Sequence, residues 1–181
     1  MPRLTILASG LLAVSLVFGQ PPAWTTGAKI APVAVGQSPN SSAFGSQVYF
    51  AGQPSETDLA EYSKLGVKTI VNLRMPAEME KAGFDEAAVA KAAGMEYVSI
   101  PVTGIPEDSD LAKIYAELNK AGSGKVLMHC ATSNRAGVAW AAFRSTQHKL
   151  PAEDALNEGK AAGLKSPALE KLTREKLGVK P

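Results

Sequence analysis

Short apolar runs alternate with amphipathic segments along residues 47–177 of this 181-residue chain. Four runs have the length of a buried strand, and they cover residues 48–52, 67–73, 95–102 and 126–128. The segments between and after them follow a helical pattern, over residues 55–64, 85–93, 111–120, 135–143, 151–162 and 166–177. Strands that alternate with helices predict a single α/β domain with a mostly parallel central sheet and helices on both sides.

Local signals mark the first of these helices. Ser55 followed by Asp58 is typical of a capping arrangement that opens a helix, and Gly66 is placed to stop it. Two connections, residues 75–84 and the acidic stretch 103–110, show no such pattern. Their conformation should set the depth of any substrate site.

The first residues have the pattern of a secretory signal peptide, which we assign to residues 1–19. Arg3 supplies a positive start, residues 4–18 form an uncharged apolar core, and Val17 and Gly19 are small enough to precede a cleavage point. We therefore expect a periplasmic or secreted protein with no stable membrane span after cleavage.

The next segment, residues 20–46, is rich in proline, glycine, serine and alanine and shows no periodicity. This composition predicts an irregular N-terminal extension. The folded domain is then expected to span residues 47–181.

The only cysteine of the chain, Cys130, stands at the predicted turn from a strand into a helix. Unpaired N–H groups and the positive end of the helix dipole favour a thiolate or a bound anion there. Arg135, five positions later, is close enough to fold its planar guanidinium back over the turn. The two residues predict an anion cradle with a nucleophile at its floor. The alternative is a buried structural cysteine beside a surface arginine.

Composition narrows the classes of function. The net charge of +2 is too small to indicate nucleic acid, and no basic run contains interleaved aromatic residues. Two histidines and one cysteine are too few for the usual protein zinc site, and one cysteine cannot form an internal disulfide. We expect no cofactor, no metal and no nucleic-acid partner. Neither the oligomeric state nor the physiological substrate follows from the sequence.

Three stretches together resemble one known family: residues 48–59 with Ala-Gly-Gln-Pro-Ser inside them, residues 67–74, and Val-Leu-Met-His-Cys-Ala-Thr-Ser-Asn-Arg-Ala-Gly at 126–137. They resemble the bacterial dual-specificity-phosphatase-like family, also described as the beta-lactamase-hydrolase-like phosphatase domain. The resemblance implies a protein-tyrosine-phosphatase fold. It also implies an exported hydrolase of phosphomonoesters, with Cys130 as the nucleophile that forms a cysteinyl-phosphate and Arg135 as the phosphate clamp.

The same resemblance gives roles to the neighbouring residues. The substrate phosphate is expected to meet the loop formed by His129, Ala131, Thr132, Ser133, Asn134 and Ala136. His129 either braces the loop and helps to keep the thiol ionised, or is only packed beneath it. Asp108 is the expected general acid, on position alone. Asp108 or Asp110 would also suit the N-cap of the next helix.

Two departures from ordinary tyrosine phosphatases leave other functions open. Only four residues separate Cys130 from Arg135, where those enzymes have five, and Ala136 stands where they usually have Ser or Thr. Thr132 and Ser133 are candidates to replace the missing hydroxyl. The short loop resembles that of rhodanese sulfurtransferases, whose cysteine carries a persulfide. Ala136, and an acid assigned on position alone, support a third function, a non-catalytic module that binds oxyanions or phosphopeptides.

Overall fold

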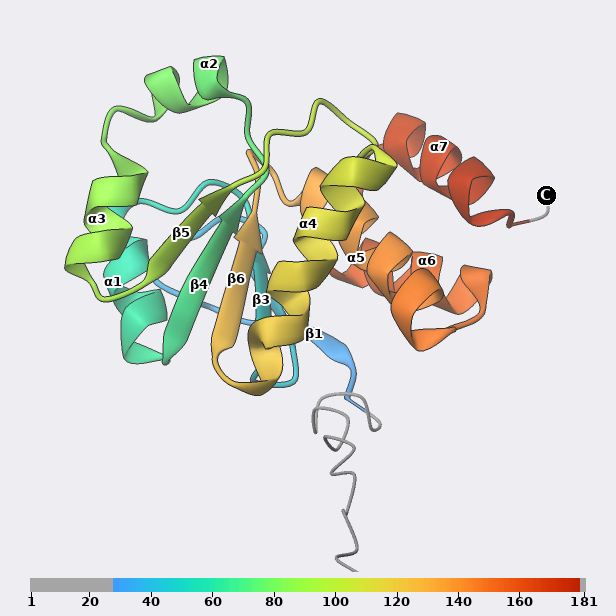
Figure 1. The fold of residues 1–181 in the computed structure, drawn as a ribbon, viewed down its shortest axis with the longest axis horizontal. Helices are drawn as coiled ribbons and strands as arrows, with labels where there is room; N and C mark the ends of the chain where they lie inside the picture. Colours follow the sequence, from blue (N-terminus) through green and yellow to red (C-terminus); the bar gives the residue numbers. More distant parts are fainter. Residues whose placement is uncertain (1–27, 180–181) are drawn as a thin grey trace, which may run out of the picture.

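The structure is a computed structural model that describes residues 28–179. The predicted signal peptide, residues 1–19, lies outside the described residues. Within them the strands form one six-stranded sheet (Figure 1). In spatial order they are β1 (Ile30–Pro32), β2 (Ser42–Phe44), β3 (Val48–Ala51), β6 (Lys125–His129), β4 (Val67–Asn72) and β5 (Glu96–Ser99). The last four run parallel, whereas β1 and β2 join the β3 edge in antiparallel pairs.

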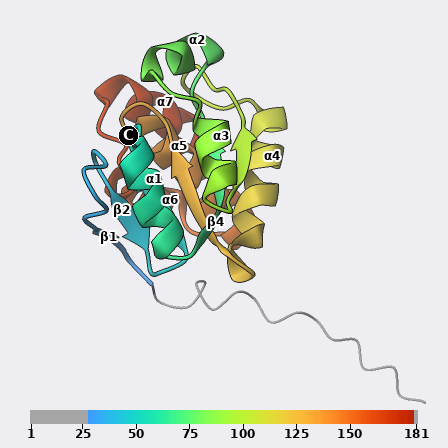
Figure 2. The same ribbon diagram turned by 90° about the vertical axis from the view of Figure 1, so that its left-hand side faces the viewer.

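Helices cover both faces of the sheet, so the predicted α/β architecture with a mostly parallel sheet is confirmed. One face carries α1 (Glu56–Lys64) and α3 (Glu86–Ala92), which lie towards the viewer in Figure 2. The other face carries α4 (Asp108–Asn119) and α5 (Asn134–His148). Helices α6 (Ala152–Ala161) and α7 (Pro167–Leu177) pack against α5. No helix within residues 28–179 has both the length and the apolar character needed to cross a bilayer.

The predicted cap of the first helix is present. Ser55 is the N-cap of α1, its hydroxyl accepts from the N–H of Asp58 at 3.2 Å, and its own N–H donates to the Asp58 carboxylate at 2.9 Å. Gly66 follows the helix with a φ of +87°, a conformation that glycine adopts without strain. The reciprocal bonds satisfy two of the N–H groups that a helix start leaves unpaired.

Residues 28–46 differ from the irregular extension expected from composition. They include β1 and β2, and Phe44 at the end of β2 is completely buried, with its ring 5.0 Å from that of Trp140. Each of these strands has three residues, too few to display a period of two, and the Pro- and Gly-containing turn between them hides the pairing. The sheet therefore begins before residue 47.

The connections also contain short helical pieces: α2 (Pro76–Met79) and η2 (Glu80–Ala82) in the first, and η3 (Lys120–Gly122) before β6. Helix α4 begins three residues earlier than its apolar pattern indicated, because its first turn is polar. Figure 1 shows α2 above the carboxyl ends of the parallel strands. That edge is where ligands bind in open sheets of this kind.

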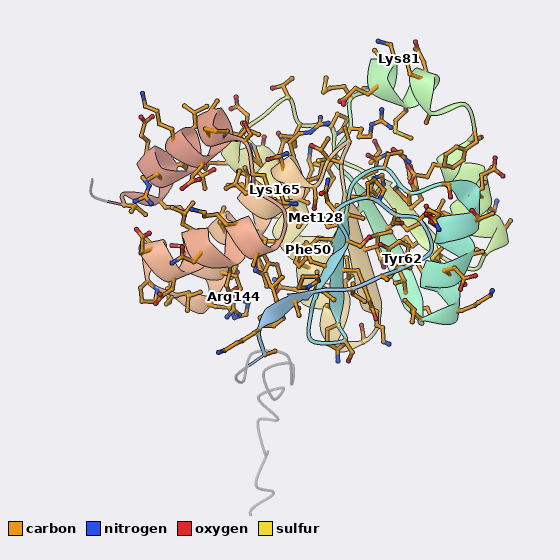
Figure 3. The ribbon with its side chains drawn as sticks, turned by 180° about the vertical axis from the view of Figure 1, so that it is seen from behind. Phe50, Tyr62, Lys81, Met128, Arg144 and Lys165 are labelled. Atoms are coloured by element: carbon orange, nitrogen blue, oxygen red, sulfur yellow. The ribbon has the colours of Figure 1, made fainter. Side chains whose placement is uncertain are left out.

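Alternation along β6 decides what lies on each side of the sheet. Val126 and Met128 face the cluster beneath α4 and α5, and Leu127 faces the cluster beneath α1 and α3. In Figure 3, Met128 lies beside Phe50 of the neighbouring strand β3. The same alternation sends His129 towards α3 and Cys130 towards α5. Two adjacent residues of the motif thus occupy different environments.

Candidate active site

Cys130 directly follows strand β6 and therefore lies at the carboxyl edge of the parallel strands. The cysteine is 1% exposed, and its N–H lies 3.4 Å from the Ala51 carbonyl of β3. Helix α5 begins four residues later, at Asn134, and runs for 15 residues away from this point. Its positive end and unpaired N–H groups therefore face the turn after Cys130.

Two carbonyls of the turn are hydrogen-bonded to neighbouring segments. The carbonyl of Ala131 accepts from the N–H of Gln53 at 3.2 Å, and that of Thr132 accepts from the side chain of Asn40 at 3.3 Å. The antiparallel bridge between Gly52 and Thr132 engages one N–H of the turn, and the other N–H groups of residues 131–136 make no hydrogen bond to the residues that the structure describes. Free donors at the start of a helix favour a bound anion.

Ser133 gives the turn its sharpness. It has a φ of +69°, a left-handed conformation that costs energy for a side-chain-bearing residue. Its buried hydroxyl donates to the Ala162 carbonyl at 2.7 Å, and Gly163 packs so closely that an added Cβ would lie 2.5 Å from the Ser133 Cβ. The serine side chain thus fastens the loop to the α6–α7 connection, and its hydroxyl points away from the cradle.

The side chain of Asn134 also fastens the loop to the α6–α7 connection. Its side-chain oxygen accepts from the N–H groups of Lys165 and Ser166, both at 2.7 Å, and its side-chain nitrogen donates to the Thr132 hydroxyl at 2.9 Å. Of the two candidates to replace the hydroxyl absent at Ala136, only Thr132 faces the hollow above the loop. Ala136 itself is fully buried in α5.

Both terminal nitrogens of the Arg135 guanidinium, Nη1 and Nη2, are hydrogen-bonded. Nη1 and Nη2 donate to the two carboxylate oxygens of Glu78 at 2.8 and 2.7 Å. Nη1 also donates to the carbonyls of Leu73 and Val102, at 3.2 and 2.7 Å. The hydrogen bonds with Glu78 raise the pKa of Arg135 against the effect of burial, and the charge of Cys130 adds to the rise. The side edge, Nε and the second hydrogen of Nη2, makes no hydrogen bond to a nitrogen or oxygen of a described residue.

The same ion pair lowers the pKa of Glu78. The hydrogen bonds from Arg135 lower the pKa of Glu78 to about 2, although partial burial works against ionisation. The carboxylate is therefore ionised at neutral pH. Arg135 and Glu78 form a fixed ion pair at the rim of the site.

A hollow of about 420 Å³ lies above the loop. Its lining residues are Met75, Glu78, Thr103, Thr132, Asn134, Arg135, Ser166 and Leu169. Both irregular connections contribute, as expected. Met75 and Leu169 are the apolar side chains of this lining, and they come from α2's N-cap and from α7. Its volume suits a small ligand.

Asp108, the expected general acid, lies elsewhere. It is the first residue of α4, its side chain is 95% exposed, and it pairs with Lys176 of α7 at 3.1 Å. It lines a hollow between α4 and α7 and not the one that Arg135 lines. The N-cap of α4 is Glu107, so neither Asp108 nor Asp110 caps the helix. In this conformation the expected acid is not brought to the thiol.

His129 does not line the hollow either. It is completely buried, and its Nε2 lies 3.0 Å from Oε1 of Glu86, the first residue of α3. Sequence reasoning missed both Glu86 and Glu78. Glu86 stands in an ordinary amphipathic helix, and no signal separates Glu78 from Glu80 two positions later. Among the described residues no group of three His, Cys, Asp or Glu side chains is placed to hold a metal ion.

Comparison with known proteins identifies a family and a fold. The profile of the family "Beta-lactamase hydrolase-like protein, phosphatase-like domain" matches residues 44–146. The beta-lactamase hydrolase-like protein of Agrobacterium fabrum is 30% identical over 116 residues, and that of Xylella fastidiosa is 27% identical over 115. Each match covers 62% of this chain but 27% of the relative, so the chain spans about a quarter of these proteins' length.

Solved structures show the same fold. Pseudomonas aeruginosa TpbA superposes with a TM-score of 0.67 at 21% identity, over 86% of this chain and 92% of TpbA. A cysteine-to-serine variant of TpbA has been crystallised with phosphotyrosine. The kinase associated phosphatase, crystallised with its catalytic cysteine replaced by serine, superposes with a TM-score of 0.62 at 15% identity, over 74% of this chain and 89% of its own. The fold is that of cysteine phosphatases.

Proposed function

The chain belongs to the family of beta-lactamase hydrolase-like phosphatase domains, and on this basis we propose that it hydrolyses phosphomonoesters with Cys130 as the nucleophile. One observation carries the proposal. Cys130 precedes a turn in which most N–H groups are unpaired among the described residues, and the guanidinium of Arg135 lies close enough to the thiol to interact with it. This arrangement suits the equatorial oxygens of a phosphoryl group under attack.

The proposed reaction has two steps. The Cys130 thiolate attacks phosphorus, an S–P bond forms as the P–O bond to the leaving alcohol breaks, and the leaving oxygen takes up a proton. Water then attacks the cysteinyl-phosphate, which releases inorganic phosphate and restores the thiolate. The amides of residues 131–136 and Arg135 bind the non-bridging oxygens in both steps. Thr132 is the hydroxyl available to assist the second step.

The charges at the site favour aryl esters. Glu78 is the carboxylate beside Arg135, and with a pKa of about 2 it is a poor proton donor at neutral pH. Asp108 keeps its proposed role only if it reaches the leaving group in the substrate complex. A phenolate leaves with less help than an alkoxide because a phenol hydroxyl has a pKa of about 10. We therefore propose aryl phosphates as preferred substrates, in line with the phosphotyrosine complex of TpbA.

The test is hydrolysis of p-nitrophenyl phosphate by the whole chain, by Cys130→Ser and by Arg135→Ala. We expect turnover by the wild type, its loss in both variants, and an acid-quenched phosphoenzyme that is absent from Cys130→Ser. Asp108→Asn should affect alkyl phosphates more than p-nitrophenyl phosphate if Asp108 is the acid. Absence of turnover from a folded wild type that binds phosphate through Arg135 would overturn the hydrolase proposal and leave the binding module.

The sulfurtransferase alternative rests on the short Cys130–Arg135 spacing alone. Formation of thiocyanate from thiosulfate and cyanide by the wild type, together with inactivity towards p-nitrophenyl phosphate, would favour it.

We further propose that the protein is exported, because residues 1–19 have the composition of a signal peptide. Support would come from a fusion of residues 1–46 to a reporter that is active only outside the cytoplasm. A reporter that stays inactive, with the full-length fusion retained in the cytoplasmic fraction, would contradict export.

A further inference from the structure

A buried carboxylate, that of Glu86, lies against His129, the residue before the nucleophile. Glu86 is 2% exposed, and its carboxylate is surrounded by four polar groups. Gln53 Nε2 and His129 Nε2 lie 3.3 and 3.0 Å from Oε1, and Asn72 Nδ2 and the Tyr97 hydroxyl lie 2.9 and 3.4 Å from Oε2. A carboxylate removed from water needs a compensating charge or full hydrogen bonding. Among these four groups, His129 is the one that can become a cation.

The other charged and titratable groups near His129 do not supply the positive charge that would compensate the Glu86 carboxylate. Burial raises the pKa of Tyr97, on β5, to about 12, so its phenol stays neutral. Arg74, after β4, reaches Glu86 only through Gln53, whose side-chain oxygen it contacts. The terminal nitrogen Nη2 of Arg74 donates to the carbonyl of Glu78 at 2.7 Å. Two further ionisable groups stand next to the pair in the chain: Asp85, the N-cap of α3, and Cys130 itself.

Both the ring and the backbone of His129 are held in place. His129 is fully buried, and its carbonyl accepts from the N–H of Leu73 at 2.9 Å, which fixes the backbone just before the nucleophile. The contact with Glu86 is short but not aligned as a hydrogen bond, and Nδ1 has no hydrogen-bond partner among the described residues. The attraction between the ring and the carboxylate is therefore chiefly one of charge. In a low-dielectric interior such an interaction is screened little.

We propose that Glu86 is a positioning residue for the nucleophile: its carboxylate holds the His129 ring, next to the nucleophile in the chain, in the charged, doubly protonated form, and that fixed charge favours the thiolate of Cys130. The proposal rests on the proposed function only in calling Cys130 a nucleophile. It assigns to α3, a helix on the opposite face of the sheet from α5, a part in preparing the thiol.

The test measures thiol reactivity and not turnover. The rate of alkylation of Cys130 by iodoacetamide at pH 6 is compared in the wild type, Glu86→Gln, His129→Gln and the double variant. We expect each single variant to react roughly tenfold more slowly than the wild type, because the thiolate fraction falls when a neighbouring cation is lost. The double variant should react no more slowly than His129→Gln, because Glu86 acts through the histidine.

Asp58→Asn is the matched control. Asp58 is also a buried carboxylate, 3% exposed, but it caps α1 and is far along the chain from the loop. Its conversion to an amide should lower the thermal stability and leave the alkylation rate of the folded protein unchanged. An alkylation rate equal to that of the wild type in folded Glu86→Gln would overturn the proposal, as would independent, multiplicative effects in the double variant.

A second measurement needs no variant at Glu86. The chain has only two histidines, His129 and His148, so the side-chain 15N resonances of His129 can be assigned from a single His148→Gln variant. We expect chemical shifts of a doubly protonated ring at pH 7, and shifts of a neutral ring would refute the proposal. Because neither readout requires phosphate hydrolysis, failure of the proposed function would leave these results intact, and the reverse also holds.

Discussion

Glu78 holds the end edge of the Arg135 guanidinium with both carboxylate oxygens, at 2.7 and 2.8 Å. Nη1 of Arg135 also donates hydrogen bonds to the carbonyls of Leu73 and Val102. The arginine is thus fixed beside Cys130, with Nε making no hydrogen bond to a nitrogen or oxygen of a described residue. An anion over the loop would meet a donor already in place, which reduces the entropy lost on binding.

The first prediction concerns this ion pair. Glu78→Gln should weaken phosphate binding roughly tenfold, because a hydrogen bond between charged groups contributes about 1.5–3 kcal/mol and its loss frees the guanidinium. The measurement is the shift of the unfolding temperature with phosphate concentration. Glu80→Gln, which changes an exposed carboxylate two positions away, is the control and should match the wild type. Tighter phosphate binding by Glu78→Gln would mean that the carboxylate blocks the site.

The second prediction follows from the same carboxylate and pH. The pKa of Glu78 is lowered in the folded protein from 4.5 to about 2, mainly by the hydrogen bonds from Arg135. A group with a lowered pKa stabilises the folded state above its unfolded pKa, and this contribution disappears as the pH falls through the folded value. Between pH 4.5 and 2 the free energy of unfolding of the wild type should therefore fall more steeply than that of Glu78→Gln. Parallel curves from urea unfolding would contradict this expectation.

The third prediction concerns the apolar wall of the hollow. Leu169 lines it from α7, and truncation to alanine should raise KM for aryl phosphates about five- to tenfold, because up to about 2 kcal/mol of apolar contact is lost. KM for a small alkyl phosphate should change little. Leu172→Ala is the control, since Leu172 is on the same helix, is 45% exposed and is not among the residues that line the hollow. Equal effects of the two substitutions would remove Leu169 from the substrate site.

The fourth prediction concerns the α6–α7 connection. Gly163 has a φ of +116°, and an added Cβ would lie 2.5 Å from Cβ and 2.6 Å from Oγ of Ser133. Gly163→Ala should destabilise the fold by more than 2 kcal/mol, from strain and overlap together. Gly94→Ala, where φ is +73° but no atom lies within 4 Å, isolates the strain and should cost about 1 kcal/mol.

Phosphate binding by folded Gly163→Ala should also be weaker than that of Gly94→Ala, since the overlap pushes on the residue that shapes the turn. Indistinguishable unfolding temperatures for the two variants would show that the overlap relaxes without cost.

Much of the fold followed from local patterns. The capping pair Ser55 and Asp58, the glycine stop at Gly66 and the apolar strands were readable because each depends on residues within a few positions of one another. Trp140 and Phe143, at helical spacing within the predicted helix 135–143, are both fully buried. The strands β1 and β2 were not foreseen. Each has three residues, too few to show the alternation of a strand, and a loop separates the two strands that pair.

The site divides in the same way. The strand, the turn and the helix around Cys130, and the spacing to Arg135, were predictable because these residues are close in the chain and obey local backbone geometry. Which carboxylates meet them depends instead on the packing of distant segments. Glu78 is 57 positions from Arg135 in the sequence. Helix packing brings Glu78 and Glu86 to the loop and carries Asp108 to Lys176, since contacts between distant segments depend on how the sheet is covered and not on spacing along the chain.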